Sequence, residues 1–487
     1  MNNSRPVEVE TLWLYDQRDG LQPPPGLVWR GLQCCQIEQS ACGTYISVVL
    51  QGWQGRLGSV DRHRPCDNIY VYHVVLYSTS GAMQEQARFC TGVWWPKIQW
   101  SPSGHLCIAQ LLGNDTESSA DELCCQAYGD ELLQELFLQS AAFVWDPKTA
   151  EVLHSLSPDT SAALRVLGKG CSISPAWSPS CQHLLIVGQH SRDRDEANRQ
   201  GWLLIADVGQ GRIVGQSNIT FTAVNFESLG RKVFWHPRSH GLILSYNVQV
   251  QDTAPFLQKG FALGSLPQQL TMHTAGFSAD ACYLVARSHK PRQFSDSDAL
   301  AGCTMEGLHI RLDQVQPLVQ QEPCKVQYLG WLPDGADLFM ICAMEHRPAL
   351  CYVLWQYSAS YGAFVPQVYE QNAPIRYQPS YCQSQRFSPS GKLFMAVASP
   401  SMQIINLVTG QQCWEAITQH TMLPQPAEFE LRGLSESDQH LIICLDFCAW
   451  LPTGLGFLCS TWELNYGDEC TPCAPPALHR YHFAKRS

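Results

Sequence analysis

The sequence predicts an all-β fold built from a repeated two-strand unit, and three observations support this prediction. The stretch QWSPSGHLCIAQLL, residues 99–112, joins an aromatic residue, a tight polar turn and an apolar run. Similar stretches recur along most of the chain. Several of the apolar runs have no polar face, so both of their faces need cover. A ring of small sheets packed face to face, a β-propeller, provides that cover.

The number of repeated stretches predicts the number of sheets. Each has an aromatic residue, a turn of Ser, Pro, Asp or Gly, and a run of branched and aromatic side chains, which is typical of two strands joined by a tight turn. Seven segments match well, and their aromatic residues are Trp100, Trp177, Trp235, Phe277, Trp331, Phe387 and Trp450. An eighth segment, SACGTYISVVL from Ser40, lacks the aromatic residue. We therefore expect a single propeller of seven or eight four-stranded blades, with eight favoured, and an unrelated β-sandwich is the alternative.

A second turn signal supports the same unit. The third strand of the clearest units ends in an Asp or Asn that starts a turn, at Asp146, Asp207 and Asn406. Asp and Asn favour such positions because their side chains accept hydrogen bonds from the backbone that follows. The sequence Gly209-Gln-Gly211, which loosely resembles a dinucleotide-binding loop, is expected to be one of these turns.

The repeats also define the domains. Residues 35–487 are expected to form the propeller, with an insertion at 114–140. Residues 1–34 form an N-terminal segment, and its apolar stretch from Val9 to Tyr15 could supply the last strand of the final blade. Such a strand closes the ring and removes two sheet edges.

The chain resembles the WD-repeat and related β-propeller families from about residue 35 onward. Their blades carry a Ser-Pro-Asp-Gly-like turn between the first two strands and a Trp-Asp pair at the end of the third, and here Trp145-Asp146 is that pair. The other blades lack the pair, and the Gly-His dipeptide that usually precedes a blade is missing. The resemblance implies a divergent WD-repeat-like propeller.

Composition restricts the partners. The 487 residues are 45% hydrophobic and 15% charged, which is typical of a globular chain, and the net charge of −11 disfavours nucleic acid. We find no apolar run long enough to span a bilayer and no secretory signal, so we expect an intracellular protein, cytoplasmic or nuclear, without membrane insertion. Most of the 22 cysteines are then expected to be small buried hydrophobic residues.

The insertion at 114–140 is the most distinctive loop. It has seven acidic residues and no Lys or Arg, and its apolar residues follow helical spacing. It is either an acidic amphipathic arm that binds a protein partner or a cover for the rim of the propeller. The candidate partner-binding residues are Asp121, Glu122, Asp130, Glu131, Leu132, Leu133, Glu135, Leu136 and Phe137.

Motifs for catalysis are missing from the sequence. It contains no Gly-x-Ser-x-Gly elbow, no phosphate-binding loop and no His-Glu-x-x-His helix. The residues with zinc-like spacing are Cys470, Cys473, His479 and His482. Because the gap between the two pairs is short and the region reads as a strand, we expect no metal and no cofactor.

These observations favour a non-catalytic scaffold or adaptor that binds protein partners on the long-loop face of the propeller, alone or within a larger complex. Long loops on a rigid scaffold are where binding commonly occurs. The alternative is a propeller enzyme, a hydrolase or lyase, with its site in the central channel. An RNA-handling subunit is a third hypothesis, disfavoured by the charge.

Overall fold

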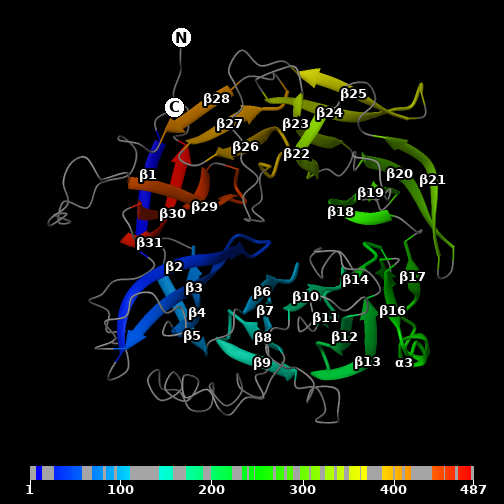
Figure 1. The fold of residues 1–487 in the computed structure, drawn as a ribbon, viewed down its shortest axis with the longest axis horizontal. Helices are drawn as coiled ribbons and strands as arrows, with labels where there is room; N and C mark the ends of the chain where they lie inside the picture. Colours follow the sequence, from blue (N-terminus) through cyan, green and yellow to red (C-terminus); the bar gives the residue numbers. More distant parts are fainter. Residues whose placement is uncertain are drawn as a thin grey trace.

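Seven β-sheets follow one another around a ring in the computed structural model (Figure 1). The structure describes residues 7–13, 27–56, 69–79, 84–92, 96–109, 142–156, 172–189, 199–221, 233–238, 241–245, 247–266, 270–278, 282–288, 297–306, 309–317, 324–333, 337–344, 350–361, 363–369, 387–398, 401–408, 412–417, 441–454, 456–466 and 470–483. We number the sheets 1 to 7 in chain order. In Figure 1 the first strand of a sheet lies nearest the centre of the ring and the last lies at the rim, as β6 and β9 show.

The first half of the ring contains three sheets of consecutive strands. Sheet 1 holds β2 (Leu27–Gln39), β3 (Tyr45–Arg56), β4 (Ile69–Ser78) and β5 (Gln84–Gly92). Sheet 2 holds β6 (Lys97–Trp100), β7 (Leu106–Ala109), β8 (Ala142–Asp146) and β9 (Glu151–Leu156). Sheet 3 holds β10 (Ser172–Trp177), β11 (His183–Gln189), β12 (Arg199–Asp207), β13 (Arg212–Phe221) and β16 (Val248–Val250).

Sheet 4 departs from the blade pattern because strands of two repeats join. It runs from β14 (Val233–Trp235), β15 (Leu242–Leu244) and β17 (Leu263–Ser265) to β21 (His309–Pro317), β20 (Ser297–Glu306), β19 (Tyr283–Ser288) and β18 (Leu270–Phe277). β15 and β17 pair in parallel, and β17 reaches β21 through the single pair Ser265 and His309. The connection between β16 and β17 holds α3 (Ala254–Gln258), the one helix in the described part of the chain.

The remaining three sheets complete the ring. Sheet 5 holds β22 (Cys324–Trp331), β23 (Leu338–Met344), β24 (Leu350–Ser358) and β25 (Ala363–Tyr369). Sheet 6 holds β26 (Leu393–Ala398), β27 (Ser401–Asn406) and β28 (Gln412–Ile417). Sheet 7 holds β29 (Leu441–Trp450), β30 (Gly456–Tyr466) and β31 (Cys470–Phe483), and β1 (Val7–Trp13) pairs with β31 along seven residues.

The all-β propeller fold predicted from the repeats is confirmed, but the expected seven or eight four-stranded blades are not. Six sheets have three to five strands, and the other strands merge into the seven-stranded sheet 4. The merging follows from the single pair Ser265 and His309, which joins β17 of one repeat to β21 of the next. The helical insertion at 114–140 lies outside the described residues, and none of the described residues form a helix that could cross a membrane.

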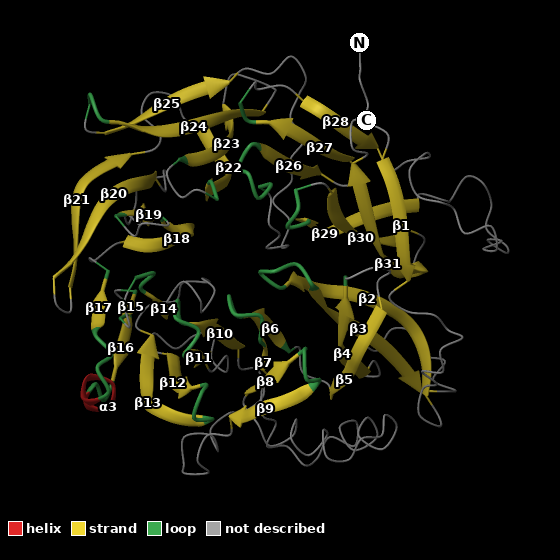
Figure 2. Cartoon of the chain, turned by 180° about the vertical axis from the view of Figure 1, so that it is seen from behind, coloured by secondary structure: helices red, strands yellow, loops and turns green. Residues whose placement is uncertain are grey.

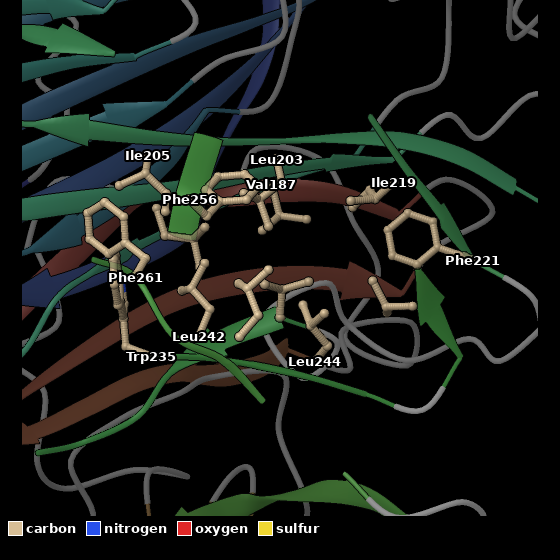
Figure 3. Packing of buried hydrophobic residues seen from close by; sticks show 14 residues of the cluster. Val187, Leu203, Ile205, Ile219, Phe221, Trp235, Leu242, Leu244, Phe256 and Phe261 are labelled. Carbon is tan, nitrogen blue, oxygen red and sulfur yellow. The ribbon is translucent and has the colours of Figure 1, made fainter. Parts of the chain in front are cut away.

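The hydrophobic core lies between neighbouring sheets, because the second strand of a sheet is buried on both faces, as β7 is. One cluster fills the space between sheets 3 and 4, and Phe256 of α3 packs over it with Phe261 and Trp235 (Figure 3). Another joins sheet 7 to sheet 1, where Ile37 and Leu50 meet Ala449 and Leu458. The ring is thus closed by the same kind of packing that holds its other sheets together.

The predicted turns are confirmed at all eight anchors. In each, the residue after the anchor position donates its backbone N–H to a carbonyl four or five residues on, as Ser101 does to His105 and Ser388 to Leu393. Figure 2 shows several of these turns, in green, around the centre of the ring. Five buried serines also accept a backbone N–H across the turn with Oγ: Ser40, Ser101, Ser178, Ser278 and Ser388. The serine is therefore part of the turn and not a nucleophile.

The turns that follow Asp146, Asp207 and Asn406 are confirmed as well. The side chain of each accepts a backbone N–H two or three residues on, at 2.9 to 3.0 Å. The Gly209–Gly211 segment lies in the turn after Asp207 and joins β12 to β13, so it is not a dinucleotide site.

Candidate functional site

Indole groups tie the inner strands of neighbouring sheets together. Nε1 of Trp177 donates to the Gln99 carbonyl at 3.1 Å, and Nε1 of Trp235 donates to the Ala176 carbonyl at 2.9 Å. Nε1 of Trp100 lies 3.3 Å from the Glu38 carbonyl, and it donates to Ser47 Oγ at 2.9 Å. Each accepting carbonyl belongs to the residue just before an anchor position, so the structure superimposes the repeats residue by residue.

This alignment shows polar side chains in two sheets at a position that is small or apolar in the other described repeats. Glu38 in sheet 1 and Gln99 in sheet 2 precede their anchor positions by one residue. The described equivalents in the other repeats are Ala176, Phe234, Gly276, Gly330 and Ala449, and the remaining equivalent, Arg386, lies outside the described residues. A carboxyl group at this position has no role in the repeated packing, so Glu38 is the candidate functional residue.

Glu38 lies between the inner strands of sheets 1 and 2. Its Oε1 accepts a hydrogen bond from Gln36 Nε2 at 2.8 Å, and the same nitrogen reaches the Ile98 carbonyl at 3.3 Å. β6, which carries Ile98, is the edge strand of sheet 2. The Gln36 and Glu38 side chains therefore meet the backbone of the next sheet, near the turn end of β2.

The environment of Glu38 favours its protonated form. Burial raises the pKa of the carboxyl group to about 7, although hydrogen bonds from Gln36 and the Trp100 backbone and the charge of Lys97 act in the opposite direction. The residue as a whole is only half-buried. Near neutral pH a carboxyl group of this kind exists in both protonation states, which suits a general acid or base. The negative charge, with burial, also raises the pKa of the Cys107 thiol.

The seam between sheets 7 and 1 differs from the three seams that indole groups join. Gln39 occupies the anchor position of sheet 1, and its amide has no hydrogen-bond partner among the described residues. Two contacts hold the seam instead. Arg480 Nη1 donates to the Thr79 carbonyl at 2.9 Å, and the turn glycine Gly43 lies against the ring of Pro452.

The zinc candidates lie along one strand. Cys470, Cys473, His479 and His482 all belong to β31. Cys470 and His479 are nine residues apart, which separates their backbones by roughly 30 Å in an extended strand. His479 is buried, and burial lowers its pKa to about 4. Among the described residues, no three His, Cys, Asp or Glu side chains form a metal-binding group. The structure thus does not bring the four together.

The predicted partner-binding residues at 114–140 cannot be placed. Asp121, Glu122, Asp130 to Leu133 and Glu135 to Phe137 all lie outside the described residues. That prediction stays untested.

Comparison with known proteins finds relatives by fold alone. No protein-family model matches the chain, and no curated protein matches its sequence. A solved oligogalacturonate lyase from Vibrio parahaemolyticus has 10% identity and a TM-score of 0.41, with 99% of each chain covered. The Dos1 propeller has 10% identity and a TM-score of 0.37, with 95% of each chain covered. A periplasmic gluconolactonase from Pseudomonas aeruginosa has 13% identity and a TM-score of 0.34, covering 78% of this chain and 84% of that one.

These structures correct the expected function. Two of the three are named as enzymes, a lyase and a lactonase, which contradicts the prediction of a non-catalytic scaffold. At these identities the likeness itself shows the β-propeller fold, and no match supports a WD-repeat family.

Sequence reasoning missed Glu38 because the first repeat was the weakest match. The signal was nonetheless present. Once the turns are aligned on Ser40 and Ser101, the residue two places earlier is Glu38 or Gln99, and apart from Arg386 the other repeats have small or apolar residues there. Its burial and its contact with Gln36 required the structure.

Proposed function

We propose that this protein is a β-propeller enzyme of the hydrolase or lyase type, with Glu38 as its general acid–base group. A single observation carries the proposal. Glu38 is a half-buried carboxyl on the strand nearest the centre of the ring, desolvated enough to exchange a proton near neutral pH. Residues with strongly shifted pKa values gather at functional sites.

The chemistry of one such carboxyl fits both reaction types. In hydrolysis the carboxylate takes a proton from water, the hydroxide adds to the substrate, and the protonated acid returns the proton to the leaving group. In elimination it takes a proton from carbon, the electron pair forms a double bond, and the leaving group departs with the proton. In either case Glu38 ends in its starting state.

Neighbouring groups suit this role. Lys97 favours the carboxylate form after proton release, and burial favours the acid form, so the two effects act against each other. The Trp100 indole and Ser47 hold the backbone of Glu38 in place. The backbone of Glu38 is therefore held by side chains from both sheets.

The test is a substrate screen with two matched variants. The wild type is assayed against simple esters, oligogalacturonates and sugar lactones, the last two taken from the names of the compared enzymes. Glu38→Gln keeps the shape of the side chain but cannot exchange the proton, and Glu85→Gln changes an exposed residue of β5 in the same sheet. We expect about a 10²- to 10⁴-fold loss of kcat for Glu38→Gln and none for Glu85→Gln.

The products separate the two reactions, because elimination creates a double bond that absorbs ultraviolet light and hydrolysis does not. Equal activity of Glu38→Gln and wild type on every substrate turned over would remove Glu38 from the reaction.

A further inference from the structure

The amide of Gln36 has one possible orientation. Its Nε2 lies 2.8 Å from Glu38 Oε1 and 3.3 Å from the Ile98 carbonyl. The Ile98 carbonyl can only accept, and so can the Glu38 carboxylate. Turning the amide would place its oxygen against both acceptors, so the NH₂ group must face them.

This arrangement fixes the carboxyl group relative to two sheets. Gln36 and Glu38 are both on β2 and point to the same side, since successive side chains of a strand alternate. Ile98 lies on the edge strand of sheet 2. The amide thus spans the two inner strands and holds one carboxyl oxygen in place.

We propose that Gln36 is a positioning residue. Its N–H donates to Oε1 of Glu38, so that the exchangeable proton is carried by Oε2. This inference rests on the proposed function for its catalytic meaning. The physical reason is that the carbonyl oxygen of a protonated carboxyl group is a better acceptor than its hydroxyl oxygen, so a hydrogen bond from the Gln36 N–H favours the state in which Oε1 is the carbonyl oxygen.

The test measures the carboxyl group directly. Protein labelled with ¹³C at the glutamate carboxyl is titrated by NMR, and the resonance missing from Glu38→Gln identifies Glu38. Gln36→Met keeps the length of the side chain and removes the donor. Because the hydrogen bond favours the charged form, we expect the pKa of Glu38 to rise by about one unit.

Lys97→Met is the matched control. It also raises the pKa of Glu38, because it removes a positive charge. Added salt should reduce the effect of Lys97→Met, since salt screens charges, and leave the effect of Gln36→Met unchanged. An unchanged pKa in Gln36→Met overturns the proposal.

The position of the proton has its own readout. Below the pKa, the infrared difference between wild type and Glu38→Gln contains the carbonyl stretch of protonated Glu38. In Gln36→Met this stretch should move to higher frequency, because the carbonyl oxygen Oε1 has lost its donor. No movement means that Oε1 carries the proton, which overturns the proposal.

A second variant covers the case in which Gln36→Met does not fold. Gln36→Glu keeps the size of the side chain and places a like charge beside Glu38, so one carboxyl of the pair must titrate above the wild-type value. If both titrate at or below it, Gln36 does not contact the carboxyl. The titrations need no substrate, so an inactive protein with the expected pKa changes would reject the proposed function alone.

Where activity is found, its pH profile should shift with the NMR pKa in Gln36→Met, with a smaller change in KM. A purely structural role would lower kcat without moving the profile.

Discussion

The pH dependence of stability tests the buried carboxyl without any knowledge of the substrate. The pKa of Glu38 is about 7 in the folded protein, against an ordinary value of 4.5. Between these values the folded protein keeps a proton that the unfolded chain has lost, so unfolding becomes easier as the pH rises. The contribution of protonated Glu38 to stability is therefore fully present below about pH 4.5 and is lost as the pH rises through about 7.

The size of the effect follows from the shift. A difference of about 2.5 units between the two values corresponds to roughly 3 kcal/mol, at about 1.36 kcal/mol per unit. Glu38→Gln has no such proton to lose, so the variant lacks this pH-dependent loss of stability. The free energy of unfolding of the variant, measured relative to that of the wild type, should therefore increase by about 3 kcal/mol as the pH is raised from roughly 4 to 8.

Urea denaturation at a series of pH values measures the difference. Glu85→Gln in the same sheet is the control and should run parallel to the wild type. A constant difference between Glu38→Gln and wild type across the range would refute the reasoning, because it would mean that Glu38 titrates alike in the folded and unfolded states.

Three further predictions concern the repeated turns and the closing seam. Cys181 has a φ of 58° where other turns have glycine, so Cys181→Gly should stabilise the protein by about 0.5–1 kcal/mol, measured by urea denaturation. Gly104→Ala should lower the free energy of unfolding by about 1 kcal/mol through backbone strain alone. Gly43→Ala should lower it by roughly 1–3 kcal/mol more, because the added Cβ would overlap the ring of Pro452. Equal losses in the two variants would contradict this packing. Arg480→Met should lower the melting temperature by removing the bond between sheets 7 and 1, and no loss would show that the seam does not depend on it.

The repeated turns were readable from the sequence because their signals are local. Ser101 and Gly104 determine their turn through their own hydrogen bond and dihedral angles, and the same residues recur at 388 and 391. Asp207 likewise identifies its turn, through a backbone bond three residues away. The all-β propeller follows from repetition of these units.

The departures from the repeat needed the tertiary structure. The joining of β17 to β21 depends on one residue pair 44 positions apart, Ser265 and His309, and no local pattern encodes it. The long-loop candidates at 114–140 remain a prediction.

By itself the sequence determined the turns, the strands they connect and the apolar faces between sheets, because each depends on residues a few positions apart. Only the tertiary structure decided that Gln36, which donates a hydrogen bond to Glu38, also reaches the carbonyl of Ile98, 62 positions further along the chain, and that Glu38 is desolvated there. Burial and pKa depend on which sheets face each other. They belong to the assembled ring, and the candidate site is found there.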